Sequence, residues 1–242
     1  MEYLTINTQK IPYVLKRAEK KYRVSIRFAK DSQLLVVESP DGTLTREVQH
    51  FIESKSAWIS RQYQRRKAYH QQRKAFWDTL KNKRELPYLG ESHKLRFQKA
   101  KKSRVEYTPG QLTIYTREKD LQYGEKAILK SALIARAKVE FPQLTHRWAT
   151  ITQSEVKAVK VKNQTTRWGS CSTLHNVNLN WHLIFLPQVL VEYVIIHELM
   201  HLREMNHSAA FWNHVATYCP DYKRLDKEVD TYLWVIGILE GK

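Results

Sequence analysis

Two histidines, four residues apart, enclose the stretch of this chain with the clearest chemistry. The stretch is His197-Glu198-Leu199-Met200-His201. On an α-helix, residues four positions apart lie on one face, so the two imidazoles can bind a single metal ion together. Glu198 lies beside this pair, where a carboxylate can take the proton of a metal-activated water. This spacing predicts a metal-dependent hydrolytic site.

His207, six residues after His201, supplies a third imidazole. A catalytic zinc ion is held by three protein ligands and keeps a fourth position for water. The interval to His207 is the one found in metzincin peptidases, but Glu204 stands where those enzymes have a glycine for a sharp turn. The chain must therefore reach His207 by a different turn, and a left-handed Asn206 would provide one. The side chain of Glu204 is a weaker candidate ligand, because it lies about 10 Å along the helix from His197.

The residues around the motif predict a buried helix. Apolar side chains occupy nearly every face between Val189 and Leu202, and a helix that is apolar all round is normally buried. Pro187 suits its first turn, where a missing N–H costs nothing. Buried histidines need polar partners, and a shared metal satisfies several rings at once. We expect one Zn²⁺ per chain, with Glu198 as catalytic residue and with the ligands His197, His201 and His207.

The segment before this helix is expected to form strands and to contact the substrate. An edge strand beside the metal-binding helix of a peptidase can pair with an extended peptide. Arg167 can clamp a carboxylate or a phosphate, and the alternative is that Arg167 and Trp168 only stabilise a turn. Cys171 is expected to be a small buried thiol. The candidate substrate-binding residues are Arg167, Trp168, Gly169 and Asn180.

Several short motifs surround the histidines. They are Arg167-Trp168-Gly169-Ser170-Cys171, Leu179-Asn180, Pro187, the run from Tyr193 to Leu202, Asn206-His207-Ser208 and Phe211-Trp212. Together they resemble the YgjP-like family of zinc-dependent metallopeptidases, which is similar to the SprT and WLM metalloproteases. The resemblance is dense over residues 156–235 and implies that the three histidines bind the metal and that Glu198 is the catalytic acid/base. It also implies a β-rich segment upstream.

The composition is that of a globular protein. The chain has 242 residues, of which 42% are hydrophobic and 11% aromatic, enough for a packed core. No stretch approaches the roughly 18 apolar residues of a membrane span, and residues 1–5 lack the features of a signal peptide. Two cysteines are too few for a disulfide framework. We expect a cytoplasmic protein without a membrane partner.

The positive charge lies entirely in the first 150 residues. The net charge of +17 divides into +10 for residues 1–85, +7 for residues 86–150 and zero for residues 151–242. A basic region beside a neutral hydrolase segment favours contact with nucleic acid or another polyanion. The basic clusters are short and match no known recognition motif, so the alternative is a solvated surface.

The residue patterns predict an α+β fold. Period-two patterns predict strands in the first fifty residues and again after Leu86, and these two strand groups are loosely similar. Helical spacing follows each group, in residues 44–80 and 124–148. We expect a β-rich N-terminal part followed by a zincin-like metallopeptidase domain, whose active-site helix packs on a small sheet. The expected segments are 1–85, basic and β-rich with a helical extension; 86–150, a second strand group and long helix; and 151–242, the zincin-like catalytic domain.

The leading hypothesis for the function is a zinc-dependent hydrolase that cleaves peptide bonds with a zinc-activated water. Its substrate would be a protein or peptide. A hydrolase of nucleotide phosphoanhydride bonds, of the nucleoside triphosphate pyrophosphatase type, is the second hypothesis, because the same water and Arg167 would serve it. The third is a nucleic-acid-associated protein with a structural zinc, in which Glu198 would have no role.

Overall fold

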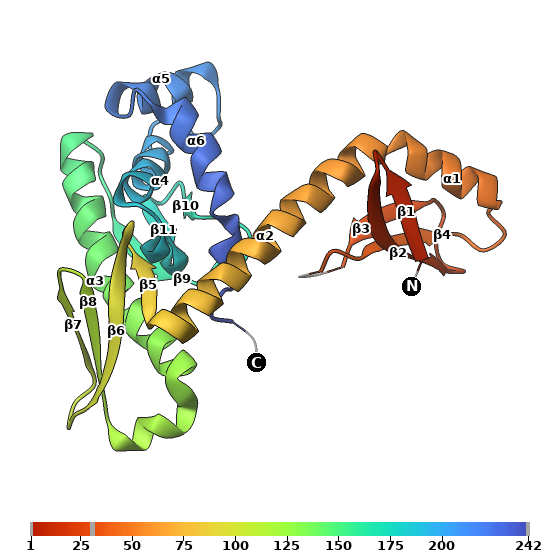
Figure 1. The fold of residues 1–242 in the computed structure, drawn as a ribbon. Coiled ribbons are helices and arrows are strands. Elements are labelled where there is room, and N and C mark those ends of the chain that lie inside the picture. The colour runs from red at the N-terminus through yellow and green to blue at the C-terminus, as the bar shows by residue number, and fades with distance from the viewer. Residues whose placement is uncertain (1, 30–31, 241–242) are drawn as a thin grey trace. The chain divides into compact units, whose positions relative to one another are not determined.

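The structure is a computed structural model that describes residues 2–29 and 32–240 (Figure 1). The chain divides into two compact units, with the boundary between Gln72 and Arg73. This differs from the expected segments 1–85, 86–150 and 151–242. The reason is that one hydrophobic core extends from Phe76 to Leu239, so the second strand group, the long helix and the histidine motif fold as one unit.

The first unit is a four-stranded sheet covered by helices. The strand order is β1-β2-β4-β3, and only the central pair, β2 and β4, is parallel. Alternate residues of the strands, such as Ile11, Leu35 and Val37, are fully buried under Val48 and Ile59 of the helices. The elements are β1 (Glu2–Ile6), β2 (Gln9–Arg17), β3 (Ser25–Phe28), β4 (Leu35–Ser39), α1 (Thr45–Ser54) and α2 (Ser56–Lys83), which continues into the second unit.

The second unit begins with a sheet of the same topology. Its strand order is β5-β6-β8-β7, again with a parallel central pair and antiparallel outer pairs. Leu112 and Ile114 of β8 pack beneath the long helix α3, as Leu35 and Val37 of β4 pack beneath α1 and α2. The elements are β5 (Glu85–Tyr88), β6 (Glu91–Lys99), β7 (Arg104–Thr108), β8 (Gln111–Thr116), the 3₁₀ helix η1 (Glu118–Tyr123) and α3 (Gly124–Ile151).

Matching details support an internal duplication of this strand unit. In each copy the residue after the second strand donates its backbone N–H to the last residue of the fourth strand. The bond joins Ala18 N to Ser39 O at 3.1 Å in the first unit and Ala100 N to Thr116 O at 2.9 Å in the second. The first hairpin of each copy turns through two residues of positive φ, which suits the twist of paired strands. The loose sequence similarity of the two strand groups thus corresponds to a shared topology.

A third, smaller sheet and a group of helices complete the second unit. The sheet order is β10-β11-β9, which leaves β10 at an edge. Helix α4 lies at the centre, against α3, α5, α6 and β10 (Figure 1). The elements are β9 (Ala158–Lys162), β10 (Gly169–Cys171), β11 (Asn176–Asn180), η2 (Trp181–Phe185), α4 (Gln188–Met200), α5 (Ala209–Tyr218), α6 (Tyr222–Thr231) and η3 (Leu233–Val235).

The hairpin between β5 and β6 fixes the start of α4. Leu89 donates its backbone N–H to Ile184 O at 2.8 Å. At Gly90, whose φ is 93°, a Cβ atom would lie 2.9 Å from the Cα atom of Pro187. Only glycine permits this approach, so the hairpin fixes the position of Pro187, the residue that precedes α4.

These features confirm the predicted fold class. The protein is a mixed α+β protein with a β-rich N-terminal part and a central helix packed on a small sheet. Among the described residues, none of the helices combines the length and apolar character required for a membrane crossing.

Candidate metal centre and active site

The central helix α4 presents two of the three histidines. It begins directly after Pro187, and its buried residues extend from Leu190 to Met200. His197 lies in its last turn, and His201 is the C-cap that directly follows its last residue, Met200. The prediction of a buried, nearly all-apolar helix that carries both histidines is therefore confirmed.

A tight turn brings the third histidine back to the first two. The backbone N–H groups of Arg203 and Glu204 both donate to Met200 O, which closes α4. Asn206 does not adopt the expected left-handed conformation, so that expectation is wrong. Instead its side-chain oxygen accepts the N–H of Ser208 at 3.0 Å, and Ser208 then caps α5. Two side-chain caps thus replace the glycine turn and place His207 at the junction between loop and helix.

The three imidazoles converge on one point. Their nearest ring nitrogens all lie within 4.8 Å of one another, and Nε2 of His197 is 3.0 Å from Nε2 of His207. Phe211 stacks on the ring of His201 with centroids 4.5 Å apart and closes one side of the cluster. Nitrogens bound to one tetrahedral zinc ion at about 2.1 Å would lie roughly 3.4 Å apart, so this arrangement has the scale of a metal site.

The protonation states of the rings also fit a metal. Nδ1 of His201 is 3.1 Å from Glu204 O, which can only accept, so this nitrogen carries the proton and Nε2 keeps its lone pair. Burial, together with the neighbouring histidines, lowers the pKa of His197 to about 3. Burial likewise lowers the pKa of His201. Neutral imidazoles are the form that binds a cation. Glu204 orients the ring of His201 through its backbone carbonyl, and its side chain does not belong to the candidate metal-binding cluster.

Glu198 lies in the same cavity as the histidines. The cavity has a volume of about 460 Å³ and is lined by α4, α6, β10 and the residues before β10. Only 6% of Glu198 is exposed. Burial raises the pKa of its carboxyl to about 8, against the opposing attraction of Arg167. A carboxyl group with a pKa near neutrality can both take and return a proton.

Gly169 forms the wall behind this carboxylate. A Cβ atom at this position would lie 2.5 Å from Oε1 of Glu198 and 2.7 Å from its Cγ. Such distances are far inside van der Waals contact, so any side chain at residue 169 would displace Glu198. The glycine is therefore required by the close approach of β10 to α4.

The free edge of β10 faces this site. In β10 and its flanks, alternate residues pair with β11, as shown by the bonds of Trp168 O to Asn180 N and of Ser172 N to Asn176 O. The backbone groups of Gly169 and Cys171 consequently point away from β11, toward the open edge. The predicted edge strand beside the active-site helix is present.

Three of the four candidate substrate-binding residues line the cavity. Arg167, Trp168 and Gly169 do so, whereas Asn180 is completely buried and does not. The side chain of Arg167 is exposed and has no hydrogen-bond or ion-pair partner among the described residues. Cys171 lines the cavity as a half-buried thiol, and burial, followed by the charge of Glu198, raises its pKa to about 11. Such a thiol remains protonated at neutral pH, although Cys171 is only half-buried where a buried thiol was expected.

The sequence did not assign a role in the site to the pair of residues on the opposite wall. Tyr193 and Asp226 both line the cavity, and the hydroxyl of Tyr193 donates to Oδ1 of Asp226 at 2.7 Å. Burial and this hydrogen bond raise the pKa of Tyr193. Because Tyr193 precedes His197 by four residues, helical spacing alone could have placed it on the face of the metal ligands.

Comparisons with known proteins give one family match and two solved structures of low similarity. Residues 22–232 match the family described as YgjP-like, metallopeptidase domain. The crystal structure of the metallopeptidase zymogen abylysin of Pyrococcus abyssi is 22% identical, over 38% of this chain and 92% of that chain, with a TM-score of 0.35. The corresponding zymogen of Methanocaldococcus jannaschii, jannalysin, is 19% identical, over 39% and 97%, with a TM-score of 0.36. A search of curated proteins found no match.

The family match spans most of the chain, including the histidine cluster, Glu198 and the edge strand. The chain belongs to the YgjP-like family and carries its metallopeptidase domain, which makes it a metal-dependent hydrolase of the metallopeptidase type.

Proposed function

We propose that this protein is a zinc peptidase in which His197, His201 and His207 hold one Zn²⁺ per chain. The observation that carries the proposal is the convergence of three imidazoles in the cavity that also contains Glu198. Three imidazoles are a donor set that suits zinc and leaves one position open. When bound, zinc would polarise the scissile carbonyl and lower the pKa of the attacking water toward neutrality.

Glu198 is the proton carrier of the proposed reaction. Its carboxylate accepts a proton from the attacking water and then delivers it to the nitrogen of the departing amine. Burial raises the pKa of Glu198 to about 8, close to the range in which both transfers are balanced. Gly169 fixes the carboxylate by leaving no space behind it.

The open edge of β10 is the proposed binding surface for an extended substrate. An extended peptide that adds to β10 would exchange backbone hydrogen bonds with Gly169 and Cys171, whose polar groups face the free edge. Arg167 would then donate to a carbonyl or carboxylate of the substrate, because its guanidinium is exposed at the rim of the cavity. Trp168 would form part of the apolar floor beneath the peptide.

The substrate class can be tested with the full-length protein after zinc loading. It is incubated with an unfolded polypeptide, with a DNA-bound protein and with nucleoside triphosphates, and the products are identified by mass spectrometry. We expect new peptide termini from a polypeptide, loss of cleavage after chelation and recovery when zinc is restored. Release of pyrophosphate or phosphate without any peptide cleavage would instead support the phosphoanhydride hypothesis.

We further propose a polyanion, with nucleic acid as the leading candidate, as a partner of residues 1–150. Helix α2 supports this proposal, since it carries eight Lys/Arg residues and a single acidic residue, Asp78. In the second strand group, Lys99 and Arg104 are paired with Glu118 and Glu106. The intervening Lys101 and Lys102 are exposed and have no ion-pair partner among the described residues. These two lysines are therefore available to a phosphate backbone.

A further inference from the structure

Asn180 links three points of the segment that carries Arg167 to Gly169. Its side-chain nitrogen donates to both Gln164 O and Arg167 O at 2.9 Å. Its backbone N–H donates to Trp168 O at 2.7 Å. The residue is completely buried, so none of these bonds is replaced by water when it breaks. Asn180 therefore determines the path of residues 164–169.

The contacts of Asn180 fix the neighbouring His182 in one tautomer. Both side-chain N–H groups of Asn180 are used, so its oxygen must face Nδ1 of His182, which lies 2.8 Å away. An amide oxygen only accepts, and Nδ1 must therefore carry the proton. The other nitrogen, Nε2, then accepts the backbone N–H of Gly237 at 2.9 Å. His182 thus connects Asn180 to the C-terminal residues 233–240, which we term the tail.

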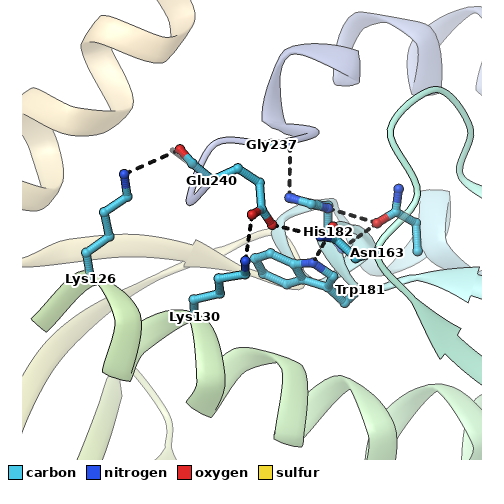
Figure 2. Close-up of polar contacts among 8 residues, drawn as sticks. Lys126, Lys130, Asn163, Trp181, His182, Gly237 and Glu240 are labelled. Atoms are coloured by element: carbon cyan, nitrogen blue, oxygen red, sulfur yellow. Dashed lines mark hydrogen bonds and ion pairs between the residues drawn. The ribbon is translucent and has the colours of Figure 1, made fainter. Parts of the chain in front are cut away.

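The tail is held in place by charged contacts at its end (Figure 2). The carboxylate of Glu240 bonds Lys130 at 2.6 Å and the side-chain nitrogen of Asn163 at 3.0 Å. Asn163 in turn accepts the indole N–H of Trp181 at 3.1 Å. Because Asn163 directly precedes the segment that Asn180 holds, the tail is attached to this segment at two places.

We infer that Asn180 and His182 are positioning residues that couple the position of the tail to the geometry of the active site. The chain of contacts proceeds from Gly237 to His182, from His182 to Asn180, and from Asn180 to the carbonyl of Arg167. Gly169 follows Arg167 by two residues and lies against the carboxylate of Glu198. A small displacement of residues 164–169 therefore moves both Arg167 and the wall behind Glu198. This inference rests on the proposed role of Glu198.

Three substitutions interrupt the coupling at successive points. Asn180→Asp keeps the shape but removes both donations to the 164–169 segment. His182→Gln disrupts the link between Asn180 and Gly237, and Glu240→Gln loosens the anchor of the tail without creating a cavity. Asn176→Asp is the matched control, because it makes the same chemical change on the same strand, where the side chain has no hydrogen-bond partner among the described residues.

Each full-length, zinc-loaded variant is compared in thermal midpoint, zinc content, kcat, KM and amide hydrogen exchange of residues 164–170. Misplacement of a site by distant substitutions can lower a rate by on the order of 10²-fold. We expect kcat to fall by about 10- to 100-fold in Asn180→Asp and His182→Gln and less in Glu240→Gln, with KM and zinc content unchanged. Exchange of residues 164–170 should accelerate in all three variants and remain unchanged in Asn176→Asp.

A purely structural role gives a different pattern. In that case the thermal midpoints fall, while kcat of the folded protein and exchange of residues 164–170 match the control, and the inference is overturned. If Asn180→Asp does not fold, His182→Gln and Glu240→Gln still decide between the two patterns. If even the wild-type protein cleaves no peptide, the proposed function fails, but the exchange measurement still tests the coupling.

Discussion

Gly169 and Glu198 approach so closely that a single methyl group between them would lie 2.5 Å from the carboxylate of Glu198. The contact joins an edge strand, β10, to helix α4, which carries His197, and it depends on a residue that has no side chain. The backbone of Gly169 also faces the open edge of the sheet. Gly169 therefore both fixes Glu198, the proposed proton carrier, and borders the proposed path of the substrate.

Gly169→Ala should lower kcat, because the new methyl group pushes the Glu198 carboxylate away from its position. We expect a loss on the order of 10²-fold with zinc content preserved, since no ligand touches residue 169. Steady-state kinetics and elemental analysis measure the two quantities. Leu174→Ala, in the exposed turn between β10 and β11 and outside the cavity lining, is the control and should retain most of the activity. Equal activity of the two variants would show that Glu198 tolerates displacement.

His201→Ala should abolish stoichiometric zinc binding, because two imidazoles rarely hold zinc against exchange with water. The same result is expected for the other two members of the cluster, His197 and His207. Elemental analysis of the folded proteins after dialysis provides the measurement. His214→Ala, in α5 and outside the cluster, should retain one zinc ion per chain. Unchanged zinc in folded His201→Ala would place the metal elsewhere.

Glu198→Gln should retain zinc and fold while losing hydrolysis. The amide fills the same volume beside Gly169 but cannot accept the proton of the attacking water. Removal of a general base typically lowers the rate by on the order of 10²–10⁴-fold. Product formation under single-turnover conditions separates this loss from any change in substrate binding. A variant with near wild-type turnover would exclude Glu198 as the proton carrier.

The stability of the protein should decrease in acid partly because of His182. Burial lowers the pKa of this histidine from 6.5 to about 4, and Glu240 partly opposes the shift. Between these two pH values the unfolded chain binds a proton that the folded chain does not, so unfolding becomes easier as the pH falls. The effect is at most on the order of 3 kcal/mol. Chemical unfolding at pH 7, 5.5 and 4 should show a smaller decrease for His182→Gln than for the wild-type protein.

The sequence predicted the elements that depend on local pattern. The strands of both groups, the helices that follow them and the buried helix of the histidine motif all have period-two or helical spacing, and each is present. The convergence of His207 with His197 and His201 also follows from spacing. The turn that reaches His207 was not predictable in detail, because capping by Asn206 and Ser208 replaces the glycine conformation that the pattern suggested.

Long-range contacts could not be obtained from the sequence. The short motif that contains Asn180 predicts a substrate-binding residue, yet its side chain donates to the backbone carbonyls of Gln164 and Arg167. His182 had no ligand spacing, and its partner Gly237 is 55 residues distant. The division into units also differs from the expected segments, since a core shared between residues far apart leaves no mark in local composition.

The basic part of the chain should bind nucleic acid in a salt-dependent manner. All of the net charge lies in residues 1–150, and phosphate contacts by lysine release counterions, so log K should decrease linearly with log salt. Lys101→Gln combined with Lys102→Gln should reduce the magnitude of this slope by up to about 2, at roughly 0.9 for each phosphate contact. The control combines Lys223→Gln with Lys227→Gln, which remove the same charge from the neutral segment and should leave the slope unchanged. Fluorescence anisotropy of labelled single- and double-stranded DNA provides the measurement at several salt concentrations. If the intact protein binds neither at low salt, DNA is excluded as the partner of residues 1–150, and the solvated-surface alternative is favoured.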